Sequence, residues 1–154
     1  MIDLLNKIEQ TAYKAGQAIL AIYQSDDFSE VLKKVAIKAD DSPLTKADLA
    51  AHNIIVKDLS QITPDVPILS EESTDISYAK RKKWQKYWLV DPLDGTKEFI
   101  KRNGEFTVNI ALIENGQPIL SVVYVPVKDI AYTAAKGYGA FKKENNIRQQ
   151  INTH

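Results

Sequence analysis

The spacing of apolar residues along the chain predicts two helices followed by a series of strands. From Ile2 to Gln24 apolar residues recur at helical intervals, which is typical of an amphipathic helix that covers a sheet. A second helix is expected to begin at Thr45 and to run to about Ile62, with Thr45 and Asp48 as a variant of the capping box. The opposite face of the first helix is expected to carry the polar residues Lys7, Glu9, Gln10, Lys14 and Gln17.

Short apolar runs bounded by turn residues predict the strands. The run Tyr87–Val90 is expected to be a buried strand, and Pro92 fixes φ and removes a backbone donor, so the chain should leave the sheet there. The segment from Glu144 to His154 is polar and gives no signal of a core. The other strands are predicted at Val31–Ala39, Ile68–Ser70, Thr107–Ile113, Pro118–Val125, Ile130–Ala135 and from Ala140 to Lys143. We therefore predict an α+β fold, a layered sandwich in which two N-terminal helices pack on a mixed, mostly antiparallel sheet.

The composition fits one globular domain and excludes several other classes of protein. Of the 154 residues 44% are hydrophobic, so the chain can form a core. Its 20 basic and 20 acidic side chains cancel, so it has no net positive charge that would attract nucleic acid. The absence of cysteine excludes disulfides and thiolate metal sites. No apolar run approaches the ~20 residues of a transmembrane helix, and the N-terminus lacks the apolar region of a signal peptide. We expect a cytoplasmic protein, with peripheral attachment to the cytoplasmic side of the inner membrane left open.

Oxygen-bearing side chains collect at the predicted ends of elements. They are Asp48 in the second helix, Glu71 and Glu72 after the strand Ile68–Ser70, and Asp91, Asp94 and Thr96 after the strand Tyr87–Val90. Such ligands, with no His or Cys among them, point to Mg²⁺ rather than zinc. Two or three Mg²⁺ ions would relieve the repulsion between the carboxylates and stabilise the oxygens of a phosphoryl transfer. A water would be the nucleophile, positioned by Thr96, and Asp48 would accept its proton through Thr96.

Each of these features also has a plainer interpretation. Gly95 permits a tight turn, Thr96 is placed to cap a short helix at Lys97–Arg102, and aspartates in such turns often bond only the backbone. Asp48 fits a first-turn carboxylate stabilised by the helix dipole, and paired acidic residues usually lie on a solvated surface. The basic run Lys80–Lys83 is typical of a solvated face, with contact to an anion as the alternative. His52 is expected to be structural or on the surface rather than a ligand.

Three motifs resemble the signature of the Mg²⁺-dependent, lithium-sensitive phosphatases related to inositol monophosphatase. They are Ser-Pro-Leu-Thr-Lys-Ala-Asp at Ser42–Asp48, Leu-Ser-Glu-Glu at Leu69–Glu72, and Asp-Pro-Leu-Asp-Gly-Thr-Lys-Glu-Phe at Asp91–Phe99. The resemblance covers about Leu4 to Gln150, nearly the whole chain. Within this superfamily the chain is most similar to the bacterial 3'(2'),5'-bisphosphate nucleotidases, and the pair Lys97-Glu98 favours them over the inositol-directed members.

The resemblance implies a role for each matching residue. The implied metal ligands are Glu71, Asp91, the backbone carbonyl of Leu93, and Asp94. The implied catalytic pair is Asp48 and Thr96, which would activate the attacking water. The residues implied to contact the substrate are Glu71, Leu93, Asp94, Gly95 and Thr96, the last two through backbone donors that hold the scissile phosphate. The implied reaction is the hydrolysis of 3'-phosphoadenosine 5'-phosphate to AMP and phosphate, which clears a by-product of sulfate assimilation.

The chain departs from the family in its length. Family members continue for roughly another hundred residues into a second α/β domain. Its Trp-Asp motif gives a further metal ligand, whereas neither Trp84 nor Trp88 precedes an Asp here. We expect residues 1–143 to form the catalytic, metal-binding domain and residues 144–154 to begin the connection to a missing second domain. An apolar interface open to self-association, and little or no turnover, are expected of this chain alone. Two alternatives stay open: a phosphatase of inositol or sugar phosphates, and a non-catalytic domain that offers only a partner surface.

Overall fold

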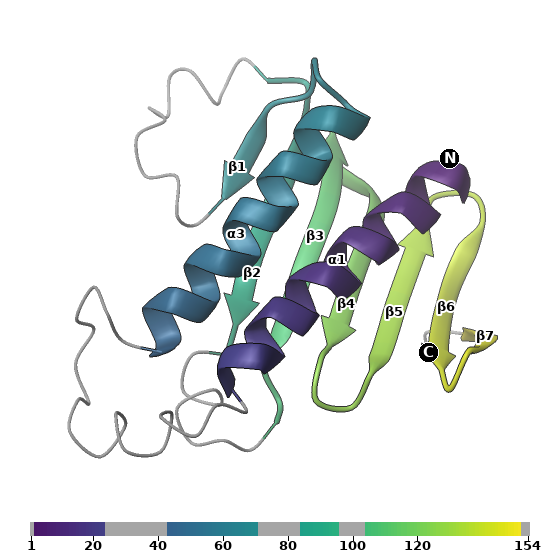
Figure 1. Cartoon of the computed structure of the whole chain (residues 1–154). Helices are drawn as coiled ribbons and strands as arrows, with labels where there is room; N and C mark the ends of the chain where they lie inside the picture. The colour runs from purple at the N-terminus through teal and green to yellow at the C-terminus, as the bar shows by residue number, and fades with distance from the viewer. Residues whose placement is uncertain (1, 24–42, 71–83, 96–103, 152–154) are drawn as a thin grey trace.

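In the part of the chain that the structure describes, two helices lie on one face of a seven-stranded sheet (Figure 1). The computed structural model describes residues 2–23, 43–70, 84–95 and 104–151. The helices are α1 (Ile2–Tyr23) and α3 (Pro43–Ile62). The strands are β1 (Ile68–Ser70), β2 (Lys86–Asp94), β3 (Thr107–Glu114), β4 (Gln117–Val125), β5 (Ile130–Ala135), β6 (Gly139–Glu144) and β7 (Ile147–Ile151).

The strands follow one another across the sheet in chain order, from β1 to β7. β1 pairs with β2 in parallel, with Ser70 opposite Val90, and the other neighbours are antiparallel. The mixed, mostly antiparallel sheet predicted from the sequence is therefore confirmed. Short turns join the successive antiparallel strands from β3 to β7.

Helix α3 runs opposite in direction to β1 and β2. Near its C-terminal end, the Thr63 hydroxyl accepts a hydrogen bond from the indole Nε1 of Trp88, at 2.8 Å, close to the start of β2. The N-terminal part of α3 therefore lies at the end of the sheet where β2 finishes (Figure 1). The shorter strand β1 ends beside the middle of α3, where Ser70 contacts His52.

The core lies between the two helices and the sheet. Trp88 and Phe106 are the largest fully buried side chains, and the predicted inward positions of β3 are at most 2% exposed. Each large aliphatic side chain buried in this way stabilises the fold by about 1.5–3 kcal/mol. The remaining core comes mainly from the helix faces and from alternate residues of β2, β3 and β4: Leu5, Ile8, Ala12, Ala15, Ile19, Ala47, Ala51, Ile55, Leu59, Val90, Val108, Ile110, Leu112, Leu120 and Val122.

The opposite face of the sheet carries apolar side chains that no described helix covers. Leu89 on β2 is 43% exposed and Tyr132 on β5 is 38% exposed. An apolar interface was expected from the sequence, and its location stays a prediction. Self-association through it stays a prediction.

Two predicted element boundaries are wrong. Helix α3 begins at Pro43, two residues before Thr45, because a proline at the first helical position loses no intrahelical hydrogen bond. Strand β2 does not end before Pro92 but continues to Asp94, because a bulge accommodates the proline and its missing donor. The predicted strand at Val31–Ala39 lies outside the described residues.

The polar segment that begins at Glu144 also differs from the sequence-based expectation. It forms β7, which pairs with β6 through a register that joins Lys143 to Arg148 and Glu144 to Ile147. The hydrophobic pattern gave no sign of this strand, because its side chains are almost all exposed. The domain boundary at residue 143 stays a prediction, although the sheet extends past it.

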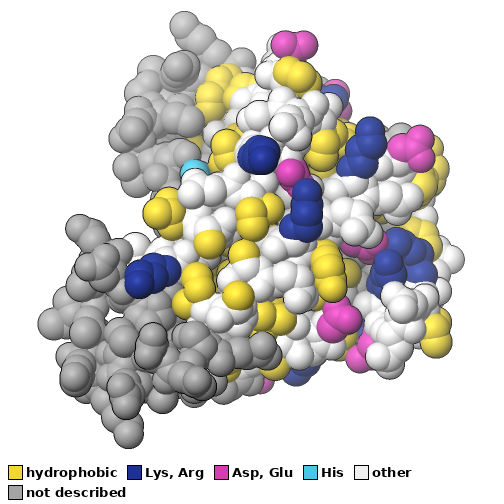
Figure 2. Space-filling model, in the orientation of Figure 1, with side chains coloured by type: hydrophobic (Ala, Val, Ile, Leu, Met, Phe, Trp, Pro, Cys, Tyr) yellow, Lys and Arg dark blue, Asp and Glu magenta, His cyan; other side chains and the backbone are white. Residues whose placement is uncertain are grey.

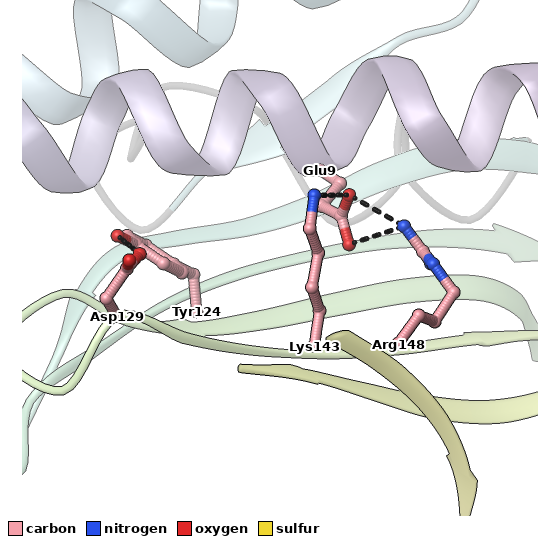
Figure 3. A network of polar contacts seen from close by, with 5 residues as sticks. All are labelled: Glu9, Tyr124, Asp129, Lys143 and Arg148. Carbon is pink, nitrogen blue, oxygen red and sulfur yellow. Dashed lines mark hydrogen bonds and ion pairs between the residues drawn. The ribbon is translucent and has the colours of Figure 1, made fainter. Parts of the chain in front are cut away.

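Glu9 is buried, contrary to its predicted place on the solvent face of α1. It is 6% exposed, and the Arg148 guanidinium donates to both of its carboxylate oxygens, at 3.1 and 3.3 Å. The Lys143 ammonium lies 3.7 Å from the same carboxylate. Figure 3 shows both cations reaching up from the strands to the helix. Two charges from the outer hairpin thus compensate one buried charge on α1.

A second polar contact lies further along the same interface (Figure 3). The buried phenol of Tyr124 donates to Asp129, at 2.7 Å, and accepts from the Gln17 amide, at 3.4 Å. Burial, followed by the hydrogen bond to Asp129, raises the pKa of Tyr124 well above its usual value. The ring is fixed at its hydroxyl end against α1.

Charged groups on the helix side of the molecule do not separate by sign. Figure 2 shows basic and acidic side chains intermixed across this face. The intermixing agrees with the equal numbers of acidic and basic residues. In the part of the chain that the structure describes, no helix is long and apolar enough to cross a membrane.

Candidate active site

A β-bulge in β2 brings two of the predicted metal ligands to one face of the sheet. Asp91 lies opposite Asn109 and Asp94 lies opposite Thr107, so three steps along β2 correspond to two along β3. Residues three apart in a regular strand point to opposite faces, and the extra residue of a bulge cancels that alternation. Asn109 and Thr107 are two apart and share a face, so Asp91 and Asp94 share it as well.

The two residues between the aspartates hold the bulge against the core. Pro92 is buried, and Leu93 is 3% exposed within the hydrophobic cluster. Gly95 follows with φ of +94°, a conformation that side chains other than glycine's rarely adopt. The buried residues Pro92 and Leu93 and the turn at Gly95 together fix the positions of the Asp91 and Asp94 carboxylates.

The carboxylate of Asp94 is held by a side chain of the neighbouring strand. Asn109 Nδ2 donates to Asp94 Oδ2 at 2.8 Å, and Thr107 Oγ1 donates to Asn109 Oδ1 at 2.9 Å. Neither Asn109 nor Thr107 was predicted from the sequence to belong to the site. The available signal was their polarity at alternate positions of an otherwise apolar strand, which alone does not distinguish a site from a solvated face.

Asp48 lies at the same end of the sheet, on the second turn of α3. It is half-buried, and Ala47 and Ala51 beside it are fully buried against the sheet. One turn further, the ring Nδ1 of His52 lies 3.0 Å from the hydroxyl of Ser70, the last residue of β1, which is 2% exposed. This contact links α3 to the end of β1. That His52 is structural or on the surface rather than a ligand stays a prediction.

The remaining predicted site residues fall outside the described residues. They are Glu71, Glu72 and Thr96, with the predicted helix Lys97–Arg102 and the basic run Lys80–Lys83. In sequence, Glu71 directly follows Ser70, and Ser70 pairs with Val90, which directly precedes Asp91.

The donors present at the end of β2 fit a hard divalent cation. Asp91 and Asp94 offer carboxylate oxygens on one face, which Mg²⁺ prefers over nitrogen or sulfur. Among the described residues no group of three or more His, Cys, Asp or Glu side chains is placed to hold a metal ion. A complete site would therefore need a further oxygen ligand beyond the two aspartates, and Glu71 is the residue that the sequence predicts for it.

A groove adjoins these residues on the sheet face opposite the helices. Its volume is about 310 Å³, and Asp91 is the one charged residue among the described residues that line it. The other lining residues are Leu89, Val90, Asn109, Ile110, Ala111, Ser121, Val122 and Val123. An apolar surface thus leads directly to the carboxylate end of β2.

Comparison with known proteins gives one family for nearly the whole chain. Residues 3–154 match the inositol monophosphatase family. The chain is 54% identical over 148 residues to the 3'(2'),5'-bisphosphate nucleotidase CysQ of Escherichia coli K12, covering 96% of this chain and 58% of the relative. It is 40% identical over 141 residues to the CysQ nucleotidase of Haemophilus influenzae, covering 92% of this chain and 50% of the relative.

Solved structures agree in fold. The crystal structure of CysQ from Bacteroides thetaiotaomicron superposes with a TM-score of 0.82 at 44% identity, covering 99% of this chain and 53% of that one. The extragenic suppressor protein SuhB from Bartonella henselae gives a TM-score of 0.74 at 32% identity, covering 99% of this chain and 55% of that one. The chain thus spans between half and three-fifths of the length of these relatives.

Proposed function

Because the chain belongs to the inositol monophosphatase family, we propose that it supplies the metal-binding and water-activating residues of a phosphatase that converts 3'-phosphoadenosine 5'-phosphate to AMP and phosphate. The support for this substrate is the 54% identity to a 3'(2'),5'-bisphosphate nucleotidase. The observation that carries the chemistry is the bulge that places Asp91 and Asp94 on one face of the sheet. The family match and the resemblance of the motifs favour metal-dependent catalysis.

The metal site in this proposal uses Glu71, Asp91, the carbonyl of Leu93, and Asp94, and it holds two or three Mg²⁺ ions. When bound, Mg²⁺ neutralises clustered carboxylates and stabilises the attacking and leaving oxygens of a phosphoryl transfer. The burial of the Leu93 side chain supports this assignment, because it fixes the backbone between the two aspartates. No thiolate is available in the chain to compete for a softer metal.

Water activation in this proposal is the task of Asp48 and Thr96. The Thr96 hydroxyl orients the water, and Asp48 accepts the proton that passes through that hydroxyl. The backbone N–H groups of Gly95 and Thr96 hold the scissile phosphate, and an anion is favoured where donors converge in this way. The position of Asp48 on α3, at the sheet end where β2 finishes, supports its inclusion.

A phosphatase of inositol or sugar phosphates is the second candidate. The observation that favours it is the likeness to an inositol monophosphatase from Zymomonas mobilis, with a TM-score of 0.76 at 26% identity. The two candidates share the metal chemistry and differ in the alcohol that leaves.

One experiment separates them. The purified 154-residue chain, in molar excess over substrate so that slow turnover is visible, is mixed with Mg²⁺ and with the nucleotide, inositol 1-phosphate or fructose 1,6-bisphosphate. We expect slow, Mg²⁺-dependent phosphate release that is fastest from the nucleotide and is lost in Asp91→Asn. Faster release from either of the other substrates would favour the second candidate. Release that needs no divalent metal, or that survives Asp91→Asn, would contradict the proposal.

A further inference from the structure

Asn109 on β3 lies beside both of the aspartates that the bulge brings to one face. Its Cα is paired with that of Asp91, while its carboxamide donates to the carboxylate of Asp94 at 2.8 Å. We propose that Asn109 is a positioning residue, which fixes the orientation of the Asp94 carboxylate for a divalent cation. This inference rests on the proposed function, since it gives Asp94 a metal to bind.

The orientation of the amide is set by the chemistry of its neighbours. An ionised Asp94 can only accept hydrogen bonds, so the Asn109 NH₂ group must face it. The carbonyl oxygen of the same amide is then left for Thr107, whose hydroxyl donates to it at 2.9 Å. Reversing the amide would set two oxygens against each other at the Asp94 end. Thr107 therefore fixes the amide, and the amide fixes Asp94.

Asp94 needs such support more than a buried ligand would. Its side chain is exposed at the end of β2, next to Gly95. An exposed carboxylate samples several rotamers, and ordering it on binding would weaken the metal affinity. Outer partners that hydrogen-bond a ligating carboxylate commonly change metal affinity by about 10–100-fold. We expect about 3–10-fold for Asn109, because solvent can replace part of its hydrogen bond.

The test measures Mn²⁺ binding to the 154-residue chain by electron paramagnetic resonance, which needs no turnover. Asn109→Leu keeps a similar volume and removes both hydrogen bonds, and it should weaken Mn²⁺ binding by about 3–10-fold. Thr107→Val, which removes only the hydroxyl that fixes the amide, should weaken it by about 2-fold. The double variant should bind like Asn109→Leu alone, because Thr107 acts through Asn109. Ser121→Ala, half-buried on the same face of β4, is the matched control and should bind like the native chain.

Circular dichroism melting of each variant separates positioning from folding. A merely structural Asn109 would lower the melting temperature and leave the Mn²⁺ affinity of the folded protein unchanged, which would overturn the inference. If Asn109→Leu does not fold, Thr107→Val decides, and native affinity in that variant would also overturn it. If Asp91→Asn binds Mn²⁺ as tightly as the native chain, the proposed metal site itself has failed. The inference alone fails when Asp91→Asn loses binding and the Asn109 and Thr107 variants do not.

Discussion

Substituting Gly16 by alanine should destabilise the protein, although the same change in most helices stabilises. Gly16 lies in the middle of α1, directly over the ring of Tyr124 on β4. In a helix interior alanine is favoured over glycine by about 1 kcal/mol. The sign of the effect therefore depends on whether the added methyl group can be accommodated at the interface between helix and sheet.

The structure leaves no room for it. A Cβ at position 16 would lie 2.6 Å from Tyr124 Cδ2, closer still to Cε2, and 3.2 Å from Pro126 Cγ. Carbon atoms pack at about 3.5–4.0 Å, so the helix and the ring would have to separate by about 1 Å. The ring cannot turn aside, because Tyr124 is 3% exposed and its hydroxyl is bonded to Asp129. A collision this close lies at the upper end of the usual cost of overpacking, about 2–3 kcal/mol, which exceeds the helix preference.

We expect Gly16→Ala to lower the free energy of unfolding by about 1–2 kcal/mol, measured by urea denaturation followed by circular dichroism. Ala21→Gly, an exposed position on the same helix, measures the helix preference alone and should cost about 1 kcal/mol. Adding Tyr124→Leu should remove most of the penalty of Gly16→Ala, because the new methyl group then no longer meets the tyrosine ring. A Gly16→Ala protein as stable as the native one, or more stable, would refute the packing argument.

Two further predictions concern the polar contacts between α1 and the sheet. The raised pKa of Tyr124 means that the folded chain keeps a proton that the unfolded chain loses, so its contribution to stability is complete below about pH 10 and falls as the pH rises from there toward the pKa of the folded state. Tyr124→Phe should therefore flatten the loss of stability above about pH 10, and an unchanged slope in pH-dependent urea denaturation would contradict this assignment. Glu9→Gln removes the buried carboxylate that pairs with Arg148 and Lys143. Since both of these side chains are about one-third exposed, we expect the free energy of unfolding to fall by about 1–2 kcal/mol, between the values for surface and buried ion pairs. Hydrogen exchange should show faster opening of β7 in this variant, and exchange at the native rate would mean that the pair does not hold the hairpin.

The sequence predicted the parts of the fold whose hydrophobic period is regular. α1 lies within one residue of its expected end, and β3 buries Val108, Ile110 and Leu112 as its alternation requires. These elements bury one face of a repeating pattern, so local sequence and tertiary packing agree. The mixed sheet followed from the same pattern together with the turn residues between strands.

The parts that the sequence did not predict depend on contacts distant along the chain. Glu9 occupies a polar position of α1, and it is buried because Arg148, 139 residues later, reaches it. β7 carries exposed polar side chains and is held by backbone pairing to β6, which leaves no hydrophobic period to detect. Both of these features, the burial of Glu9 and the strand β7, involve the hairpin of β6 and β7.

The sequence predicted Asp91 and Asp94 as site residues from their motif, but it did not predict how they are arranged. Because Pro92 was expected to end the strand, the bulge that places both aspartates on one face was not foreseen. Pro92 stays in the sheet because burying Leu93 in the core stabilises the bulge. The partner that orients Asp94 could not be found from sequence, since it depends on the register between β2 and β3.

In the proposed metal site, Asp91 and Asp94 bind one divalent cation together at the end of β2. The most direct test is Mn²⁺ titration of the native chain and of Asp91→Asn and Asp94→Asn, with circular dichroism to confirm that each variant is folded and Mg²⁺ as competitor. We predict saturable binding by the native chain that Mg²⁺ displaces, weakened by more than about tenfold in each variant. Native-like affinity in either folded variant, or no binding by the native chain, would contradict the account.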